Sequence, residues 1–281
     1  MRALVLLVLV AVNALLFTVP TPNGLAVTFF DVGQGDSILI EGPTGVQVLI
    51  DGGPSTVVVR ELGQRLPFWD KSLDAVIATH PDADHIGGLP EVLNRFAVGH
   101  IMEPGATSDT TAWSALVSAT NAELESGAQH IVPHRSMRIA LGGSAHAYVL
   151  YPTGDGNGVK DTNSASVIVR VVYGNTSFML TGDAPAAVER ELVAAYGSEL
   201  QSTVLKAGHH GSKTSSSAEF IEAVAPQYVV FSRGCDNRYG HPAPEVVERF
   251  NNLKIPGYDT CRDGTITIRS DGARLRLPSS R

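Results

Sequence analysis

The chain has 281 residues, of which 43% are hydrophobic and 17% charged, and its formal net charge is −7 at pH 7. This length allows one large domain with a full hydrophobic core, and this composition excludes a largely disordered protein. The negative net charge excludes a surface covered throughout with phosphate-binding lysines and arginines. Any contact with nucleic acid must therefore be local.

The first 24 residues differ in composition from the rest of the chain. Residues 3–19 are almost entirely apolar, and PTPNG at 20–24 follows as a short tether. The apolar run is longer than the core of a typical signal peptide and slightly shorter than a comfortable membrane span. It predicts a membrane anchor if uncleaved, or else a secretory signal peptide. In both cases we expect one extracytoplasmic domain at 25–281, membrane-anchored or secreted.

The chain holds a single pair of cysteines, Cys235 and Cys261. In an exported protein such a pair favours a disulfide, and both residues are predicted to lie in loops. Two unrelated buried thiols are the alternative.

Strand-like and helix-like runs follow one another from the tether to the C-terminus. Runs rich in β-branched residues and separated by turn residues predict strands at 26–32, 36–42, 46–52, 74–79, 98–102, 137–141, 145–151, 165–173, 176–182, 202–207 and 227–232, with two short strands between 264 and 277. Helical spacing of apolar residues predicts helices at 55–65, 88–96, 111–125, 185–196, 217–225 and 244–253. We expect sheets inside and helices outside.

Two of these helices carry more detailed expectations. Ser216 and Glu219 have the spacing of a capping box at the start of the helix predicted at 217–225. In the helix at 111–125, four apolar residues at helical spacing are expected to face a core: Trp113, Leu116, Val117 and Leu124.

Segments of the first half of the chain resemble segments of the second half. VQVLIDGG (46–53) resembles TSFMLTGD (176–183), and AVIATHPDADH (75–85) resembles TVLKAGHHGS (203–212). In each half, a strand ending near Asp is followed, after a helix, by a strand ending near His. We expect two similar halves that face each other, with these polar strand ends converging on one cleft.

The segment ATHPDADHIGGL (78–89) places two histidines and two aspartates within six residues: His80, Asp82, Asp84 and His85. In an extended or tightly turning loop, alternate side chains project the same way, so these groups can converge. Imidazoles and carboxylates are common ligands of divalent cations. We predict that His80 and Asp82 hold one ion and that Asp84 and His85 hold another.

Two later segments are predicted to complete this metal site. Asp183 would bridge the two ions, and His209 or His210 would complete the second position. Taken alone, Asp84 and Asp183 could each be a helix N-cap, and the two histidines could lie on the surface. Their combination, with glycine near every group, favours a metal site.

Six motifs together resemble the metallo-β-lactamase fold, and specifically the extracytoplasmic domain of ComEC-type DNA-uptake (competence) proteins: VTFFDVGQGDSILI, VLIDGG, THPDADHIGG, MLTGD, VLKAGHHGSKTSSS and NRYGHP. The resemblance spans roughly residues 25–270. It implies an α/β fold, a four-layer αββα sandwich with a binuclear metal centre at the sheet edge. We expect a free-standing or tethered hydrolase.

Two positions depart from the pattern of the wider superfamily. Asp82 replaces the second histidine of the usual His-x-His-x-Asp-His signature, and Asn163 stands where a further histidine ligand is expected. Both substitutions also resemble the ComEC-type branch. They favour oxygen donors, so we expect two divalent ions, Mn²⁺ or Zn²⁺, with Mg²⁺ as a third option.

The expected chemistry is attack by a hydroxide formed from metal-bound water, with Asp84 and Asp183 placing the ions. Asp51 is expected to accept a hydrogen bond from a ligand histidine and so orient its ring. His241 is the candidate that protonates the leaving alkoxide. A loop turn at His241-Pro242 is the alternative reading.

Donors beside the predicted metals suit a phosphate. They are Ser212 and Lys213 in HHGSKTSSS, and Asn237, Arg238 and Tyr239 in NRYGHP. For the hydroxyl run at 214–216, helix N-capping is the alternative.

We therefore expect an exported, metal-dependent phosphodiesterase or nuclease of the competence-protein type, with DNA as a candidate substrate and no protein partner inferred. One alternative is a hydrolase of another ester or amide, such as a phosphocholine ester, a lactone or a β-lactam. A second is a non-catalytic binding module that a metal stabilises.

Overall fold

The computed structural model describes residues 24–156, 158–159 and 161–278. The apolar run at 3–19, predicted to be an anchor or a signal peptide, lies outside the described residues. Within the described part of the chain, every helix is too short or too polar to span a bilayer.

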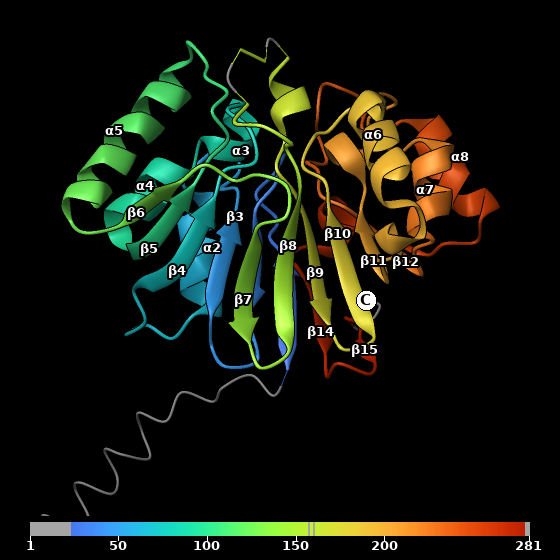
Figure 1. The fold of residues 1–281 in the computed structure, drawn as a ribbon, viewed down its shortest axis with the longest axis horizontal. Helices are drawn as coiled ribbons and strands as arrows, with labels where there is room; N and C mark the ends of the chain where they lie inside the picture. The colour runs from blue at the N-terminus through green and yellow to red at the C-terminus, as the bar shows by residue number, and fades with distance from the viewer. Residues whose placement is uncertain (1–23, 157, 160, 279–281) are drawn as a thin grey trace, which may run out of the picture.

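Two β-sheets pack face to face (Figure 1). The first sheet has the strand order β15-β14-β1-β2-β3-β4-β5-β6. Its strands are β1 (Leu25–Phe29), β2 (Ile38–Glu41), β3 (Gln47–Ile50), β4 (Ser72–Ile77), β5 (Ala97–Met102), β6 (Gln129–Ile131), β14 (Ile266–Ser270) and β15 (Leu275–Arg276). β1, β2 and β3 form an antiparallel meander, and β3 to β6 are parallel.

The second sheet has the order β13-β12-β11-β10-β9-β8-β7. Its strands are β7 (Arg138–Gly142), β8 (Ala145–Tyr151), β9 (Ile168–Tyr173), β10 (Thr176–Leu180), β11 (Val204–Lys206), β12 (Tyr228–Phe231) and β13 (Gly257–Asp259). β7 to β10 are antiparallel, and β10 to β13 are parallel. The parallel pair β10 and β11 repeats the arrangement of β3 and β4, which agrees with the two similar halves expected from the sequence.

Helices form the two outer layers (Figure 1). Those beside the first sheet are α2 (Val57–Arg65), α4 (Leu89–Arg95) and α5 (Thr111–Glu125), and those beside the second are α6 (Ala186–Tyr196), α7 (Ala218–Val224) and α8 (Pro244–Asn252). Shorter helices lie in the connections: α3 (Ala83–Ile86), α9 (Thr260–Asp263), and the 3₁₀ helices η1 (Thr162–Ala165), η2 (Gly197–Leu200) and η3 (Gly208–Gly211). The predicted αββα sandwich is confirmed.

Strands such as β1 and β2 are buried on both faces, because the other sheet covers one face and helices cover the opposite one. In β2, Ile38 and Ile40 point into the core between the sheets, whereas Leu39 between them packs under the helices. This alternation follows from the period of two along a strand. A near-continuous apolar run, such as the one in β2, is therefore what a doubly covered strand requires.

Two local expectations on the helices were wrong. The N-cap of α7 is Ser217, whose hydroxyl accepts a hydrogen bond from the Phe220 N–H at 3.3 Å. Ser216 instead has a positive φ of 53°, and its hydroxyl accepts from the Gly208 N–H at 3.0 Å. In α5, Leu116 is buried but Val117 is exposed, because neighbouring positions on a helix point in different directions.

The predicted pairing of Cys235 and Cys261 is present as a disulfide, with 4.9 Å between the two Cα atoms. It ties the loop after β12 to α9, which are 26 residues apart in the sequence. We expect the Cys235→Ser/Cys261→Ser double variant to lower the free energy of unfolding by about 3 kcal/mol, since the open loop has more freedom in the unfolded state. Urea denaturation measures this change, and an unchanged midpoint would contradict it.

Candidate metal centre

The polar strand ends predicted to converge meet at one edge of the sandwich. Asp51 directly follows β3, His80 follows β4, Asp183 follows β10, and His209 and His210 follow β11. Within each sheet these neighbouring strands are parallel, so their carboxyl ends lie at the same edge, where sites in α/β sheets commonly form.

A compact group of donors occupies this edge. One ligand-type atom from each of Asp36, His85, Asp183 and His210 lies within 4.8 Å of all the others, and all four residues are buried. His85 Nε2 lies 3.3 Å from Asp183 Oδ1, and His210 Nε2 lies 3.3 Å from Asp183 Oδ2. Asp183 is therefore the centre of the group.

Asp84 joins the same group from the start of α3. Its Oδ2 lies 3.4 Å from His210 Nε2. Separations of 3.3–3.4 Å between donor atoms are those of ligands that share one cation through bonds of about 2.1 Å. Asp84, His85, His210 and Asp183 can therefore hold one divalent ion, which is the composition predicted for the second position.

Several buried polar atoms at this edge lack a hydrogen-bond partner among the described residues: Nε2 of His80, His85 and His210, Oδ1 of Asp183, and Oδ1 of Asn163. A buried polar atom without a partner costs free energy, so a group of them calls for an explanation. Lone pairs of imidazole and carboxylate groups gathered in one place fit a divalent cation, which would satisfy them together.

The donors predicted for the first position lie beside this group. His80 Nε2 is 3.7 Å from Asp82 Oδ2. The Thr162 hydroxyl donates to Asp82 Oδ1 at 2.7 Å, which brings η1, and with it Asn163, to the same edge. The rings of His80 and His85 lie 4.1 Å apart between centroids, so the two predicted positions adjoin each other.

Hydrogen bonds at Nδ1 orient two of the histidine rings. His85 Nδ1 lies 2.7 Å from Asp51 Oδ2, and His80 Nδ1 lies 2.9 Å from the Thr79 hydroxyl, which itself donates to Asp51 at 2.7 Å. The Asp51 carboxylate accepts from Nδ1–H of His85, and the Thr79 hydroxyl oxygen accepts from Nδ1–H of His80. The Nε2 lone pairs of both rings therefore point into the site. Asp51 thus has the surroundings expected from the sequence, and Thr79 was not foreseen.

The two histidines of η3 have different surroundings. His210 is buried, and its Nδ1–H donates to the Ser232 carbonyl at 2.9 Å, which turns Nε2 toward Asp84 and Asp183. His209 is partly exposed, and its Nε2 lies 3.4 Å from Asp183 Oδ2. Of the two histidines left open by the sequence, His210 has the geometry of a ligand.

A buried ion pair beneath the site was missed in the sequence. Lys206 is fully buried at the end of β11, where its ammonium forms an ion pair with Asp36 and donates to the Gly182 carbonyl at 3.0 Å. A lysine within the apolar run of a covered strand requires a buried carboxylate partner, so Lys206 was a signal that could have been used. Because the ammonium of Lys206 neutralises the carboxylate of Asp36, Asp36 stabilises the structure around the site.

Asp183, His85 and His210 shift one another's pKa values through their charges. Burial alone would raise the pKa of Asp183, but the neighbouring His210 and His85 hold it well below its usual range. Burial alone would lower the pKa of His85 and His210, but Asp183 and further carboxylates raise it well above its usual value. In the metal-free protein, protons on these two rings therefore supply the positive charge that Asp183 requires.

His80 behaves differently from these two histidines. Burial and the neighbouring His85 lower its pKa to about 3, so its ring is neutral at physiological pH. Asp84, despite its burial, has its pKa lowered to about 2 by the neighbouring His210 and His85. A neutral imidazole and an ionised carboxylate are the states in which these side chains bind metals.

The loop carrying NRYGHP lies against this edge. The His241 ring is 5.6 Å from the His209 ring and stacks on Tyr239 at 5.7 Å. A hollow of about 400 Å³ beside it is lined by residues that include Asp84, Arg238 and Tyr239. Arg238 and Tyr239 are exposed at its rim.

Two expected substrate donors have other roles in the structure. The Asn237 side chain donates to the carbonyls of Gly234 and His241 and accepts from the His241 N–H, so it braces its own loop. Ser212 is buried, and its hydroxyl lies 2.9 Å from that of Thr214. Lys213 is exposed beside them.

Comparisons with known proteins agree with this geometry. Residues 30–234 match the family model described as the metallo-beta-lactamase superfamily. Competence protein ComA of Neisseria gonorrhoeae is 35% identical over 81% of this chain and 30% of its own length, and ComE operon protein 3 of Bacillus subtilis is 31% identical over 86% and 33%. The chain thus spans about a third of the length of these relatives.

A solved structure shares the fold. Igni18, described as a novel metallo hydrolase from the archaeon Ignicoccus hospitalis, superposes with a TM-score of 0.58, 14% identity, and coverage of 87% of this chain and 99% of that one.

Metal binding should release protons and weaken as the pH falls. Because His85 and His210 have raised pKa values, a cation that takes their Nε2 atoms must displace about two protons. Calorimetric titration with Mn²⁺ or Zn²⁺ in buffers of different ionisation enthalpy counts these protons. A dissociation constant that stays the same between about pH 8 and about pH 6 would contradict this prediction.

Removing the buried ammonium should destabilise the fold. We expect Lys206→Met to lower the free energy of unfolding by about 3–5 kcal/mol, because it leaves Asp36 charged in the interior without its ammonium partner. Adding Asp36→Asn to this variant should restore part of the lost free energy of unfolding. Chemical denaturation measures both variants, with Arg95→Gln, at an exposed position of α4, as the control. A Lys206→Met variant as stable as the control would show that the pair contributes nothing.

Proposed function

This chain belongs to the metallo-β-lactamase superfamily, and we propose that it is an exported, metal-dependent phosphodiesterase that cleaves nucleic acid. The observation that carries the proposal is the convergence, around Asp183, of buried imidazole and carboxylate atoms that lack partners among the described residues. Such a set has no purpose in a fold that requires only stability, since each uncompensated polar atom costs free energy.

Two groups of side chains would hold two divalent ions. His80, Asp82 and Asn163 would hold one, and Asp84, His85 and His210 the other, with Asp183 between them. Bound there, divalent ions supply positive charge to the phosphate oxygens and activate a water molecule for attack. Four of these seven residues bind through oxygen, which favours Mn²⁺ or Mg²⁺ more than an all-histidine site would.

The chain's own residues account for the remaining requirements. Burial and the neighbouring His209 and His210 lower the pKa of His241. Beside its proposed role as proton donor to the leaving alkoxide, His241 binds a phosphate oxygen through a ring N–H. Asp51 and Thr79 keep the ligand rings oriented and hold their protons at Nδ1.

A phosphodiester fits the surroundings of the site better than a neutral amide does. Arg238 and Lys213 are exposed cations near the edge, and charge-assisted hydrogen bonds suit the extra negative oxygen of a phosphate. One relative is named a competence protein, and together with the resemblance of the sequence motifs to DNA-uptake proteins this supports nucleic acid as the substrate.

Cleavage assays with labelled single-stranded and double-stranded DNA test this proposal. We expect cleavage in Mn²⁺ or Mg²⁺ and none in chelator, and we expect Asp183→Ala to lower the rate by at least about 100-fold because it removes the shared carboxylate. Arg95→Gln serves as the matched control. Cleavage that survives chelator, or turnover of a chromogenic lactam in place of bis(nitrophenyl) phosphate, would refute the proposal.

His241 provides a second test. Loss of one hydrogen bond to a charged phosphate should make His241→Ala slower by about 10-fold to 100-fold, while metal binding stays unchanged. Metal titration of the same variant separates a role toward substrate from a role in the metal site. A variant that cleaves as fast as the wild type would exclude His241 from the reaction.

A further inference from the structure

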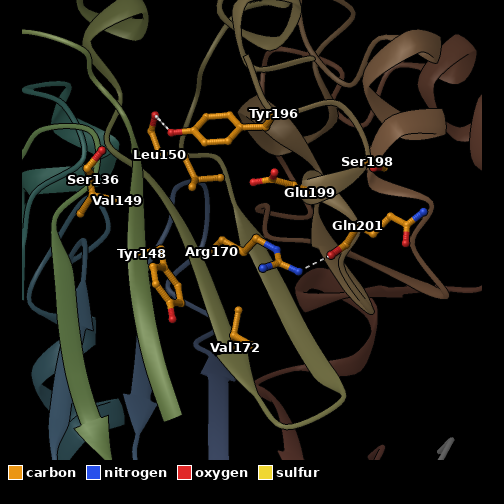
Figure 2. Close-up of a pocket in the computed structure, with 10 residues that line it drawn as sticks. All are labelled: Ser136, Tyr148, Val149, Leu150, Arg170, Val172, Tyr196, Ser198, Glu199 and Gln201. Carbon is orange, nitrogen blue, oxygen red and sulfur yellow. Dashed lines mark hydrogen bonds between the residues drawn. The ribbon is translucent and has the colours of Figure 1, made fainter. Parts of the chain in front are cut away.

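A groove lies on the outer face of the second sheet, away from the metal donors. Figure 2 shows its first part, a pocket of about 510 Å³ over β8 and β9 that the 3₁₀ helix η2 borders. A second hollow of about 390 Å³ shares Arg170, Val172 and Gln201 with it. Since these three residues belong to both hollows, the groove continues on either side of Arg170 and suits an extended ligand.

A row of basic and aromatic side chains crosses this face. Arg138 pairs with Tyr148, and Tyr148 pairs with Arg170, in the register of β7, β8 and β9. Residues directly opposite one another in neighbouring strands point to the same face. That face is the outer one, because Ala147 and Val149 on either side of Tyr148 are buried between the sheets.

The row is accessible. Helices α6, α7 and α8 lie beside β10, β11 and β12, and none of the described helices lies over β7 and β8 (Figure 1). Arg138 is exposed, and Tyr148 and Arg170 are half-buried. The Nε and Nη2 atoms of Arg170 donate to Ser202 and Gln201, which leaves Nη1 without a hydrogen-bond partner in the described part of the chain.

A second aromatic ring borders the pocket. The Tyr196 hydroxyl donates to the Leu150 carbonyl at 3.3 Å, and the Arg135 guanidinium lies 5.2 Å from the centre of the Tyr196 ring. Figure 2 places Tyr148 and Tyr196 on different sides of the pocket, with Leu150 nearby. Aromatic rings and arginine side chains together form the usual platform for unstacked bases.

Three arginine side chains lie on this face of an acidic chain. The chain has a net charge of −7, yet Arg170 lines the pocket, Arg138 follows Tyr148 in the register of the sheet, and Arg135 lies against the Tyr196 ring. Among the described residues that line the pocket, Arg170 and Glu199 are the charged ones. Guanidinium groups beside aromatic rings are complementary to a ligand that is both anionic and aromatic.

We propose that this groove binds single-stranded nucleic acid, with bases against Tyr148 and Tyr196 and phosphates on Arg138 and Arg170. The choice of ligand rests on the proposed function, which it deepens by naming a single strand as the substrate class. Strand β8, which lines the groove, also contacts the metal edge, because the hydroxyl of Tyr151, next to Leu150, donates at 3.0 Å to the Ser164 carbonyl in η1, which carries Asn163.

Fluorescence anisotropy tests the groove without any cleavage. The probe is a fluorescein-labelled oligothymidylate of about 20 nucleotides, long enough for one such site, titrated with the full chain in chelator. We expect Tyr148→Ala to weaken binding about tenfold through the loss of stacking, and Tyr148→Phe to bind as the wild type does. Arg138→Gln should lower the slope of log affinity against log salt by about 0.7, the value for one phosphate contact on a single strand.

Two further variants serve as controls: one is expected to strengthen binding, and the other is expected to leave it unchanged. Glu199→Gln should tighten binding, because it removes the carboxylate beside Arg170, and Arg95→Gln on α4 should leave it unchanged. Thermal melts establish that each variant is folded.

Wild-type binding that Tyr148→Ala and Arg138→Gln leave unchanged would overturn the groove proposal, as would equal affinity for a duplex of the same length. Failure of the enzyme proposal looks different: oligothymidylate binding would persist in the groove while no metal supports cleavage.

Discussion

The negative charge of Asp183, buried between the two halves of the sandwich, is the constraint on which the site depends. An ionised carboxylate in the interior requires positive charge nearby. Here it comes from His85 and His210 in the metal-free protein, and a divalent cation can replace their protons. The ammonium of Lys206 forms an ion pair with Asp36 and also lies 3.7 Å from Asp183 Oδ1, so it supplies further positive charge at the strand ends.

The fold produces this arrangement through its topology. Parallel strands β3 and β4 in one sheet, and β10 and β11 in the other, direct their carboxyl ends to the same edge. The chain therefore brings together residues 51, 80–85, 183 and 209–210 from both halves. Buried hydrogen bonds that Asp51, Thr79 and Ser232 accept from the ring Nδ1–H groups then orient the imidazole rings. The same sandwich leaves the outer face of β7 and β8 free, where the groove lies.

Sequence reasoning succeeded where the signal was local and dense. Strand and helix periodicities predicted sheets inside and helices outside, and the resemblance to the metallo-β-lactamase fold implied the four-layer αββα sandwich. The motif at 80–85 contains its donors within six residues. Contacts between distant residues were harder. Lys206 and Asp36 are separated by most of the chain, and neither carries a motif that names its partner. The choice between His209 and His210 depends on backbone with positive φ at both residues, which no periodicity predicts. The side-chain bonds that make Asn237 a brace within its loop are likewise visible only in the folded chain.

Anomalous diffraction from crystals grown with Mn²⁺ tests the central claim most directly. The account predicts two peaks on either side of Asp183, one near Asp84, His85 and His210, and the other near His80, Asp82 and Asn163. Crystals that bind Mn²⁺ elsewhere, or that show Asp183 paired only with protonated histidines at saturating metal, would contradict it.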